Sequence, residues 1–156
     1  MRTAFSCLHR LRRHEDGATV VEFALLAPVF FMALIGLLET GLYMQNFNAV
    51  RSLSSDAARF AAVEYQKENE LDKALLKTSI EAMAVQSPYN LNQNRLVVTV
   101  EPASSDISGA KLFDLDVTYT PPGFLDNLGM KNFKIDYSRP LYVIDNAYDP
   151  DDEEDD

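Results

Sequence analysis

The feature that most constrains this chain is one acid, Glu22, inside an apolar stretch long enough to cross a membrane. Between Ala18 and Leu38 the sequence contains no other charged residue. A helix over residues 18–43 would span about 39 Å, and the hydrocarbon core of a bilayer is about 30 Å thick. A charge inside such a segment is costly, so an acid there is a functional-site hypothesis by default.

The residues before the apolar stretch are basic and give the predicted helix an orientation. Residues 1–17 contain two acids and four arginines, which are Arg2, Arg10, Arg12 and Arg13. Positively charged flanks stay on the cytoplasmic side of a membrane. We therefore expect a cytoplasmic leader over 1–17, a transmembrane helix over 18–43 and an extracytoplasmic domain after it.

A cleavable secretory signal is the alternative explanation of this N-terminus. Its apolar region is usually about 7–15 residues long and ends at a small-x-small cleavage site. Here the apolar stretch is longer, and residues 39–43, Glu-Thr-Gly-Leu-Tyr, provide no such site. The pattern favours a retained helix, with any cut placed before it.

The rest of the chain is strongly acidic, which excludes one class of partner. The formal net charge is -10, and without the four basic and two acidic residues of the leader it is -12. Binding to nucleic acid requires clustered Lys and Arg, so we expect no nucleic-acid partner. Residues 149–156 contain seven acids and one proline, which predicts a disordered acidic tail. A calcium loop there would need alternating ligands and a turn glycine, which this run lacks.

The residue types that most often perform catalysis are confined to the leader. Cys7, His9 and His14 are the chain's only cysteine and histidines. Without them, residues 18–156 lack Ser–His and Cys–His pairs and the usual ligands of transition metals. Asp114 and Asp116 form a carboxylate pair, but on the polar face of a strand, where solvent exposure explains them. We predict no enzymatic activity, no cofactor and no metal.

The helical pattern continues past the membrane segment. No Gly or Pro separates Leu42 from Gln66, and apolar residues recur at steps of three and four, at Val50, Leu53, Ala57, Phe60 and Ala61. This predicts one long helix, apolar first and amphipathic after. A second helix follows, with one face formed by Leu71, Leu75, Thr78, Ala82 and Val85, and it ends before Pro88.

The remaining sequence predicts a small antiparallel sheet of about three strands. Residues 95–101 and 112–120 alternate with period two, and Phe113, Leu115, Val117 and Tyr119 share the apolar face. A third strand begins at Phe133, and Pro140 makes its continuation an edge or a bend. The fold class is therefore α+β, with a domain over residues 44–148.

The start of the apolar stretch resembles the processing site of type IV pilins. Gly17 is followed by Ala18, and Glu22 and Phe23 are the fifth and sixth residues after the glycine. The continuation ALLAP, which ends at Pro28, and the run DAARFAA at 56–62 narrow the resemblance. The chain resembles TadE-like pseudopilins, minor components of Tad (Flp-type) pilus systems; the sibling TadF shares this layout.

The resemblance implies a specific biology. A prepilin peptidase would cut between Gly17 and Ala18, and Glu22 and Phe23 would serve filament assembly. The product would stay in the bacterial inner membrane, with its domain in the periplasm. It would act with other pilin and pseudopilin subunits and the inner-membrane Tad machinery, at the base of the pilus or within it. The function implied is pilus assembly for surface adhesion and biofilm growth.

Physical chemistry gives Glu22 two alternative roles. A cut after Gly17 would create an α-amino group on Ala18, with a reference pKa of about 7.7–8.0. Since a buried charge must be paired, Glu22 of an incoming subunit can pair with this amine of its neighbour and fix the register. In the alternative, Glu22 only reaches the membrane interface.

Two further alternatives stay open. Pro28 lacks a backbone N–H, so it would kink or loosen the helix, either as a functional flexible point or as a tolerated membrane proline. The chain as a whole could instead be an uncleaved, single-pass, membrane-anchored binding module.

Overall fold

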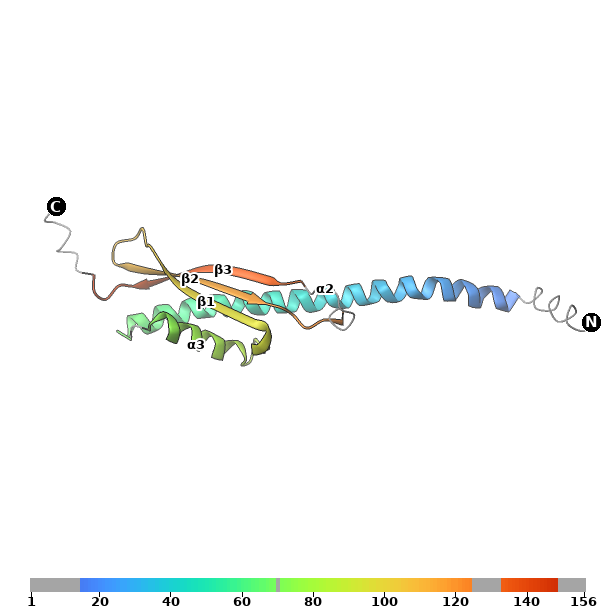
Figure 1. Cartoon of the computed structure of the whole chain (residues 1–156), viewed down its shortest axis with the longest axis horizontal. Coiled ribbons are helices and arrows are strands. Elements are labelled where there is room, and N and C mark those ends of the chain that lie inside the picture. Colours follow the sequence, from blue (N-terminus) through green and yellow to red (C-terminus); the bar gives the residue numbers. More distant parts are fainter. Residues whose placement is uncertain (1–14, 70, 125–132, 149–156) are drawn as a thin grey trace, which may run out of the picture. The chain divides into compact units, whose positions relative to one another are not determined.

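The computed structural model describes residues 15–69, 71–124 and 133–148 (Figure 1). The chain divides into two compact units, one that ends at Gly41 and one that begins at Leu42. Most of the predicted leader and the whole predicted acidic tail lie outside the described residues. Their cytoplasmic location and their disorder therefore stay predictions.

One helix, α2, runs from Glu15 to Gln66 and confirms the predicted long helix. It begins three residues before Ala18, so the end of the predicted leader is already helical. Pro28 lies inside it, and the helix continues past this residue. Because proline has no N–H, the carbonyl of Ala24 loses its helical donor there. The local loosening expected at Pro28 stays a prediction.

The second helix, α3, spans Lys73–Ala84, and its buried face differs from the predicted one. Asp72 caps it, because its carboxylate accepts a hydrogen bond from the backbone N–H of Leu75 at 2.8 Å. The buried residues are Leu76, Ile80 and Ala84. The predicted face was wrong, since Leu75 and Val85 are 55% and 42% exposed. The buried face has an apolar residue at every fourth position, whereas the predicted face included the polar Thr78.

A short 3₁₀ turn, η1 (Gln93–Arg95), leads into a sheet of three antiparallel strands in the order β1-β2-β3. The strands are β1 (Leu96–Ala103), β2 (Ala110–Tyr119) and β3 (Ile135–Ile144). The predicted inward face of β2, formed by Phe113, Leu115, Val117 and Tyr119, is buried. These findings confirm the α+β class.

Strand β3 corrects one detail of the prediction. It begins at Ile135 rather than at Phe133, whose side chain is 74% exposed. The strand passes through Pro140, which lies opposite Asp114 on β2, without ending there. Since β3 is an edge strand, one side of its backbone has no ladder partner, and a proline is tolerated. The prediction of an edge position is confirmed.

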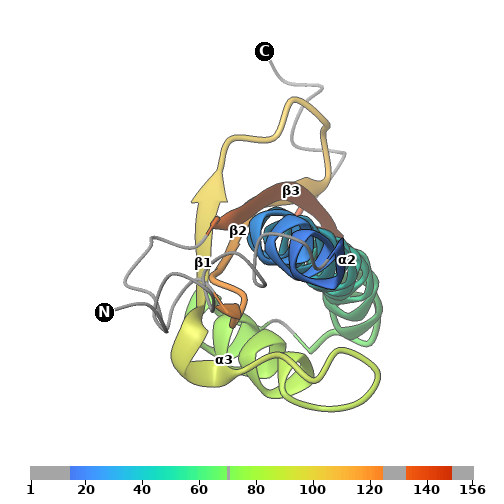
Figure 2. The ribbon, with the colours of Figure 1, turned by 90° about the vertical axis from the view of Figure 1, so that its right-hand side faces the viewer.

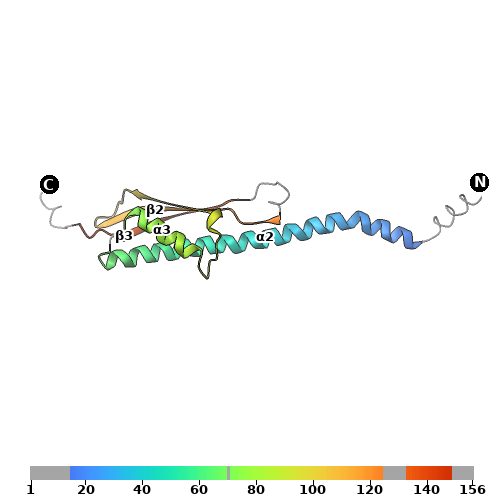
Figure 3. The same ribbon diagram turned by 60° about the horizontal axis from the view of Figure 1, so that its bottom comes forward.

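The core of the second unit lies between the helices and one face of the sheet. The part of α2 after Gly41 and helix α3 lie side by side against this face (Figures 2 and 3). From α2 the predicted stripe residues Val50, Leu53, Ala57 and Ala61 are fully buried, and Phe60 is partly buried. The opposite face of the sheet is open to solvent and carries the alternate residues of each strand.

Candidate assembly segment

The apolar part of α2 in the first unit is exposed on all sides. Its large apolar side chains from Val20 to Leu38 are between 42% and 72% exposed, except Ile35, which is half-buried. A helix that is apolar all round requires burial in a protein interior or in a membrane. By length and composition, α2 is the one helix in the described part of the chain that could cross a membrane.

The predicted cleavage junction lies at the start of this exposed helix. A side chain built at Gly17 would meet no atom within 4 Å. Phe23 is 69% exposed, and Glu22 is exposed as well. Ala18 and Glu22 are one helical turn apart, so they share a face of α2. The structure thus places Ala18 and Glu22 on one face of α2, while Gly17 and Phe23, their neighbours in sequence, lie on other sides of the helix. The roles of these residues in cleavage and assembly stay predictions.

A second acid, Glu39, marks the other end of the uncharged run. Glu39 lies seventeen positions after Glu22, which corresponds to about 26 Å of helix. That distance is slightly less than the thickness of a hydrocarbon core, about 30 Å. Both carboxylates therefore lie close to the edges of a membrane that the helix crosses. One turn before Thr40, the carbonyl of Gly36 accepts a hydrogen bond from the Thr40 Oγ1 at 2.8 Å.

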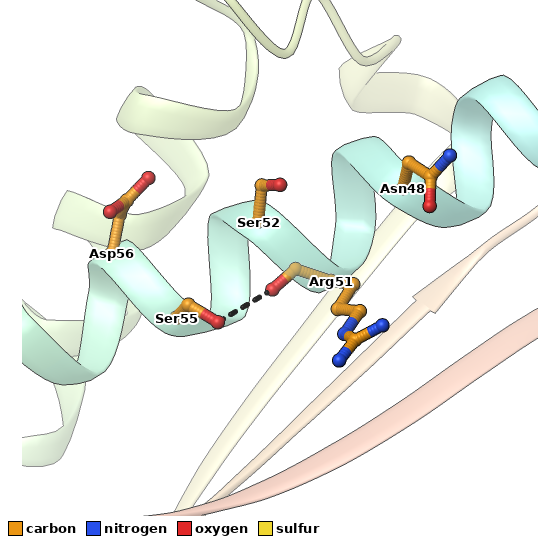
Figure 4. A pocket seen from close by; sticks show the side chains of 5 residues that line it. All are labelled: Asn48, Arg51, Ser52, Ser55 and Asp56. Atoms are coloured by element: carbon orange, nitrogen blue, oxygen red, sulfur yellow. Dashed lines mark hydrogen bonds between the residues drawn. The ribbon is translucent and has the colours of Figure 1, made fainter.

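The second unit has a shallow polar depression on the face of α2 that the sheet leaves uncovered. Figure 4 shows its lining residues, which are Asn48, Arg51, Ser52, Ser55 and Asp56; its volume is about 380 Å³. The Ser55 hydroxyl donates to the carbonyl of Arg51 at 3.1 Å. The same oxygen accepts a hydrogen bond at 2.8 Å from Nη1 of Arg139, on strand β3. Arg51 and Arg139 therefore meet at Ser55, and Arg59 follows one helical turn beyond it on α2.

Tyr89 adds a contact on the other side of this depression. Its hydroxyl donates a hydrogen bond to the Asp56 carboxylate. Burial, together with this bond to a negative group, raises the pKa of Tyr89 to about 12. The contact ties the segment after α3 to α2.

Sequence reasoning missed this group because its members come from distant parts of the chain. Ser55 and Arg139 are 84 positions apart, and only the packing of β3 beside α2 joins them. The spacing of Asn48, Ser52 and Ser55 on one helical face was the available signal. It indicates a polar face but gives no information about what lies beside it.

The solvent face of the sheet is negatively charged, in contrast to the arginines beside Ser55. Its outward carboxylates are Glu101, Asp114, Asp116 and Asp136. Glu101 lies directly across from Asp114, an arrangement of like charges that destabilises a strand pair. Lys73 on α3 approaches Glu101 at 3.0 Å and offsets part of this repulsion. Among the described residues, no group of three or more His, Cys, Asp or Glu side chains could hold a metal ion.

Two partly exposed ion pairs lie near the end of α2 and after β3. Lys67 lies 2.9 Å from Glu64, and Lys111 lies 2.9 Å from Asp145. Hydrogen bonds from these lysines lower the pKa of Glu64 and of Asp145, and Asn69 and the Ala147 N–H add to the effect. The Asn146 amide also donates to the carbonyl of Tyr65 at 3.1 Å, so the segment after β3 is joined to the last turns of α2.

Comparison with known proteins decides which family this helix resembles. Most of α2, residues 17–59, matches the family model TadE, described as TadE-like protein. This segment is TadE-like. The resemblance inferred from the sequence motifs is confirmed there, and the match includes the junction glycine, Glu22 and most of the run at 56–62. Neither a curated protein nor a solved structure matches the chain. Over this segment the chain is similar to TadE-like proteins, and the apolar helix in it is suited to be a membrane anchor.

Proposed function

We propose that the chain is a minor pseudopilin of a Tad (Flp-type) pilus system, a structural and non-enzymatic protein needed for pilus assembly and surface adhesion. In this proposal a prepilin peptidase removes residues 1–17. The helix then holds the product in the inner membrane until it joins other pilin or pseudopilin subunits. The observation that carries the proposal is the TadE-like helix, whose part before Gly41 is apolar and exposed, with Glu22 as its one charge between Ala18 and Leu38.

Glu22 supports an assembly role because its position suits pairing between subunits. After a cut, the Ala18 amine would lie one turn from Glu22 of the same helix. In a bundle of such helices the two charges can also pair between neighbours, which satisfies both groups in a medium of low dielectric constant. Phe23, 69% exposed beside the acid, would pack against the neighbouring helix.

The alternative function is an uncleaved, single-pass binding module whose outer domain recognises a partner. The mass of the protein isolated from its native membrane separates the two. The pseudopilin role requires a mature chain that begins at Ala18, and the binding module requires the full chain from Met1. A chain that begins after the apolar stretch would contradict both.

Orientation is tested separately, with protease added to spheroplasts. The four arginines before the helix predict that the C-terminal end is accessible from outside while a membrane-protected N-terminal fragment remains. If the C-terminal end is cut only after lysis, the domain faces the cytoplasm and the proposed function fails.

A further inference from the structure

The domain of the second unit carries opposite charges on two opposite surfaces. The first, the arginine face, is the uncovered side of α2 around Ser55, where Arg51 and Asp56 line the depression and Arg139 bonds to Ser55. Arg59 follows Ser55 one helical turn later on the same side of α2. The second, the acidic face, is the solvent side of the sheet with Glu101, Asp114, Asp116 and Asp136. The described strands place no Lys or Arg on that side, and one lysine of α3, Lys73, reaches it to pair with Glu101 at 3.0 Å. Because α2 packs on the inner side of the sheet (Figure 2), the uncovered side of α2 and the solvent side of the sheet lie on opposite sides of the domain.

The arginine face is unusual in this chain because the chain as a whole is acidic, so that two copies of it repel each other electrostatically. Beyond the leader the formal charge is -12, so two copies that approach at random meet like charge. A local surplus of positive charge on one surface reverses that repulsion only where it meets an acidic surface. Charge complementarity of this kind selects the partner and the orientation more than it adds affinity.

We propose that the arginine face of one copy docks on the acidic face of a second copy of this chain. This inference rests on the assembly role proposed above and names a contact within it. The two surfaces differ, so the contact is head-to-tail: each copy uses its helix side toward one neighbour and its sheet side toward the next. Such a heterologous contact leaves a free surface at each end and can propagate along a row of subunits.

The contact has a low affinity by itself, and the membrane anchor compensates by raising the effective concentration of the subunits. Exposed ion pairs contribute little individually and are screened by salt. Subunits held in one membrane by their helices have a high effective concentration for one another, which allows a weak lateral contact to be occupied. The depression of about 380 Å³ on the arginine face gives room for side chains that project from the sheet of the neighbour.

Cysteine crosslinking in native membranes tests this contact with the full chain. Two exposed serines report on the surfaces: Ser52 on the arginine face and Ser138, which lies opposite Asp116, on the acidic face. Two differently tagged copies, Ser52→Cys and Ser138→Cys, are produced together in a Cys7→Ser background. The proposal predicts a mixed disulfide dimer whose yield falls as salt is raised. The matched control pairs Ser52→Cys with Ser104→Cys, an exposed residue of the β1–β2 loop, and should give little dimer.

Charge reversal makes the test specific. Arg51→Glu together with Arg59→Glu, placed in the Ser52→Cys copy, should lower the mixed dimer by about tenfold. Asp114→Lys together with Asp116→Lys in the Ser138→Cys copy should restore it, which a merely misfolded variant would not do. The contact is overturned if the mixed dimer is absent, if it is indifferent to charge reversal, or if Ser52→Cys copies pair mainly with each other.

The outcome is distinct from that of the proposed function. Mixed dimers in a protein that keeps residues 1–17 would support the contact and contradict the pseudopilin role. A processed protein that builds pili without forming mixed dimers would overturn the contact and leave the role intact.

Discussion

Replacing Glu22 by glutamine removes one charge, keeps the shape of the side chain, and separates assembly from membrane insertion. Glu22 and Glu39 span about 26 Å of helix, against a hydrocarbon core of about 30 Å. A helix centred in such a core places each carboxylate about 2 Å inside its edge. The cost of Glu22 is therefore well below the roughly 2.5–3.5 kcal/mol of a charge at the centre of a helix.

Because the cost of Glu22 in the membrane is this small, Glu22→Gln should change partitioning into the membrane little and pilus assembly strongly. A gain below about 1 kcal/mol corresponds to less than about fivefold in partitioning. Breaking a buried ion pair by removing one partner costs about 3–5 kcal/mol, so surface pili should fall by more than about tenfold. Glu22→Asp should be intermediate, because the charge survives with a shorter reach.

The assay compares protein level, membrane fractionation, counts of surface pili and surface attachment in strains that carry each variant. Glu39→Gln is the matched control, since it removes the same charge from the other end of the same apolar run. It should leave the number of pili close to that of the unmodified protein. Normal pili with Glu22→Gln would show that this acid is an interfacial residue only. An equal loss with both variants would show a general effect of helix charge.

Three further outcomes are expected. Gly17→Leu should leave the full-length mass in the membrane, because a bulky side chain crowds the scissile bond while the folded chain has open space there. Leu53→Ala, at a fully buried site, should lower the free energy of unfolding by about 2–5 kcal/mol. The neighbouring Ser54 is equally buried, but its hydroxyl donates a hydrogen bond to the Val50 carbonyl within the same helix. Ser54→Ala should therefore lower the free energy of unfolding by about 1 kcal/mol or less. Both are read from urea unfolding in detergent. The raised pKa of Tyr89 contributes stability that is full below pH about 10 and lost as pH rises to about 12, so Tyr89→Phe should flatten the fall in stability over that window.

The local sequence pattern was enough to predict the elements that have one clearly apolar face and one clearly polar face. The alternation in β2 allowed only one of its two faces to be the buried one. Phe113, Leu115 and Val117 are apolar and share one face, whereas Asp114 and Asp116 lie on the other. In α3, adjacent apolar residues at positions 75 and 76 offered two stripes, and only packing against β1 and α2 selects Leu76. The start of β3 depends on tertiary contacts too, since Phe133 fits the alternation but packs edge-on to Tyr43 outside the strand.

The candidate site divides in the same way. Gly17, Glu22 and Phe23 are readable because their spacing along one helix is itself the signal. The arginine face is not readable, because it depends on how far β3 reaches beside α2. No local pattern connects Ser55 with a residue 84 positions later.

The division of α2 between two environments makes these tests informative. Between Gly17 and Gly41 no residue of the helix is buried, whereas after it Val50, Leu53, Ala57 and Ala61 are fully buried against the sheet. The free energy of folding of the domain therefore comes from residues beyond Gly41, and changes at Gly17 or Glu22 remove no contact of its core. A Glu22 variant that fails to build pili would still carry a folded domain, with the same unfolding transition as the unmodified chain. A lower unfolding transition in that variant would contradict this separation, because it would mean that the first unit contributes to the stability of the second.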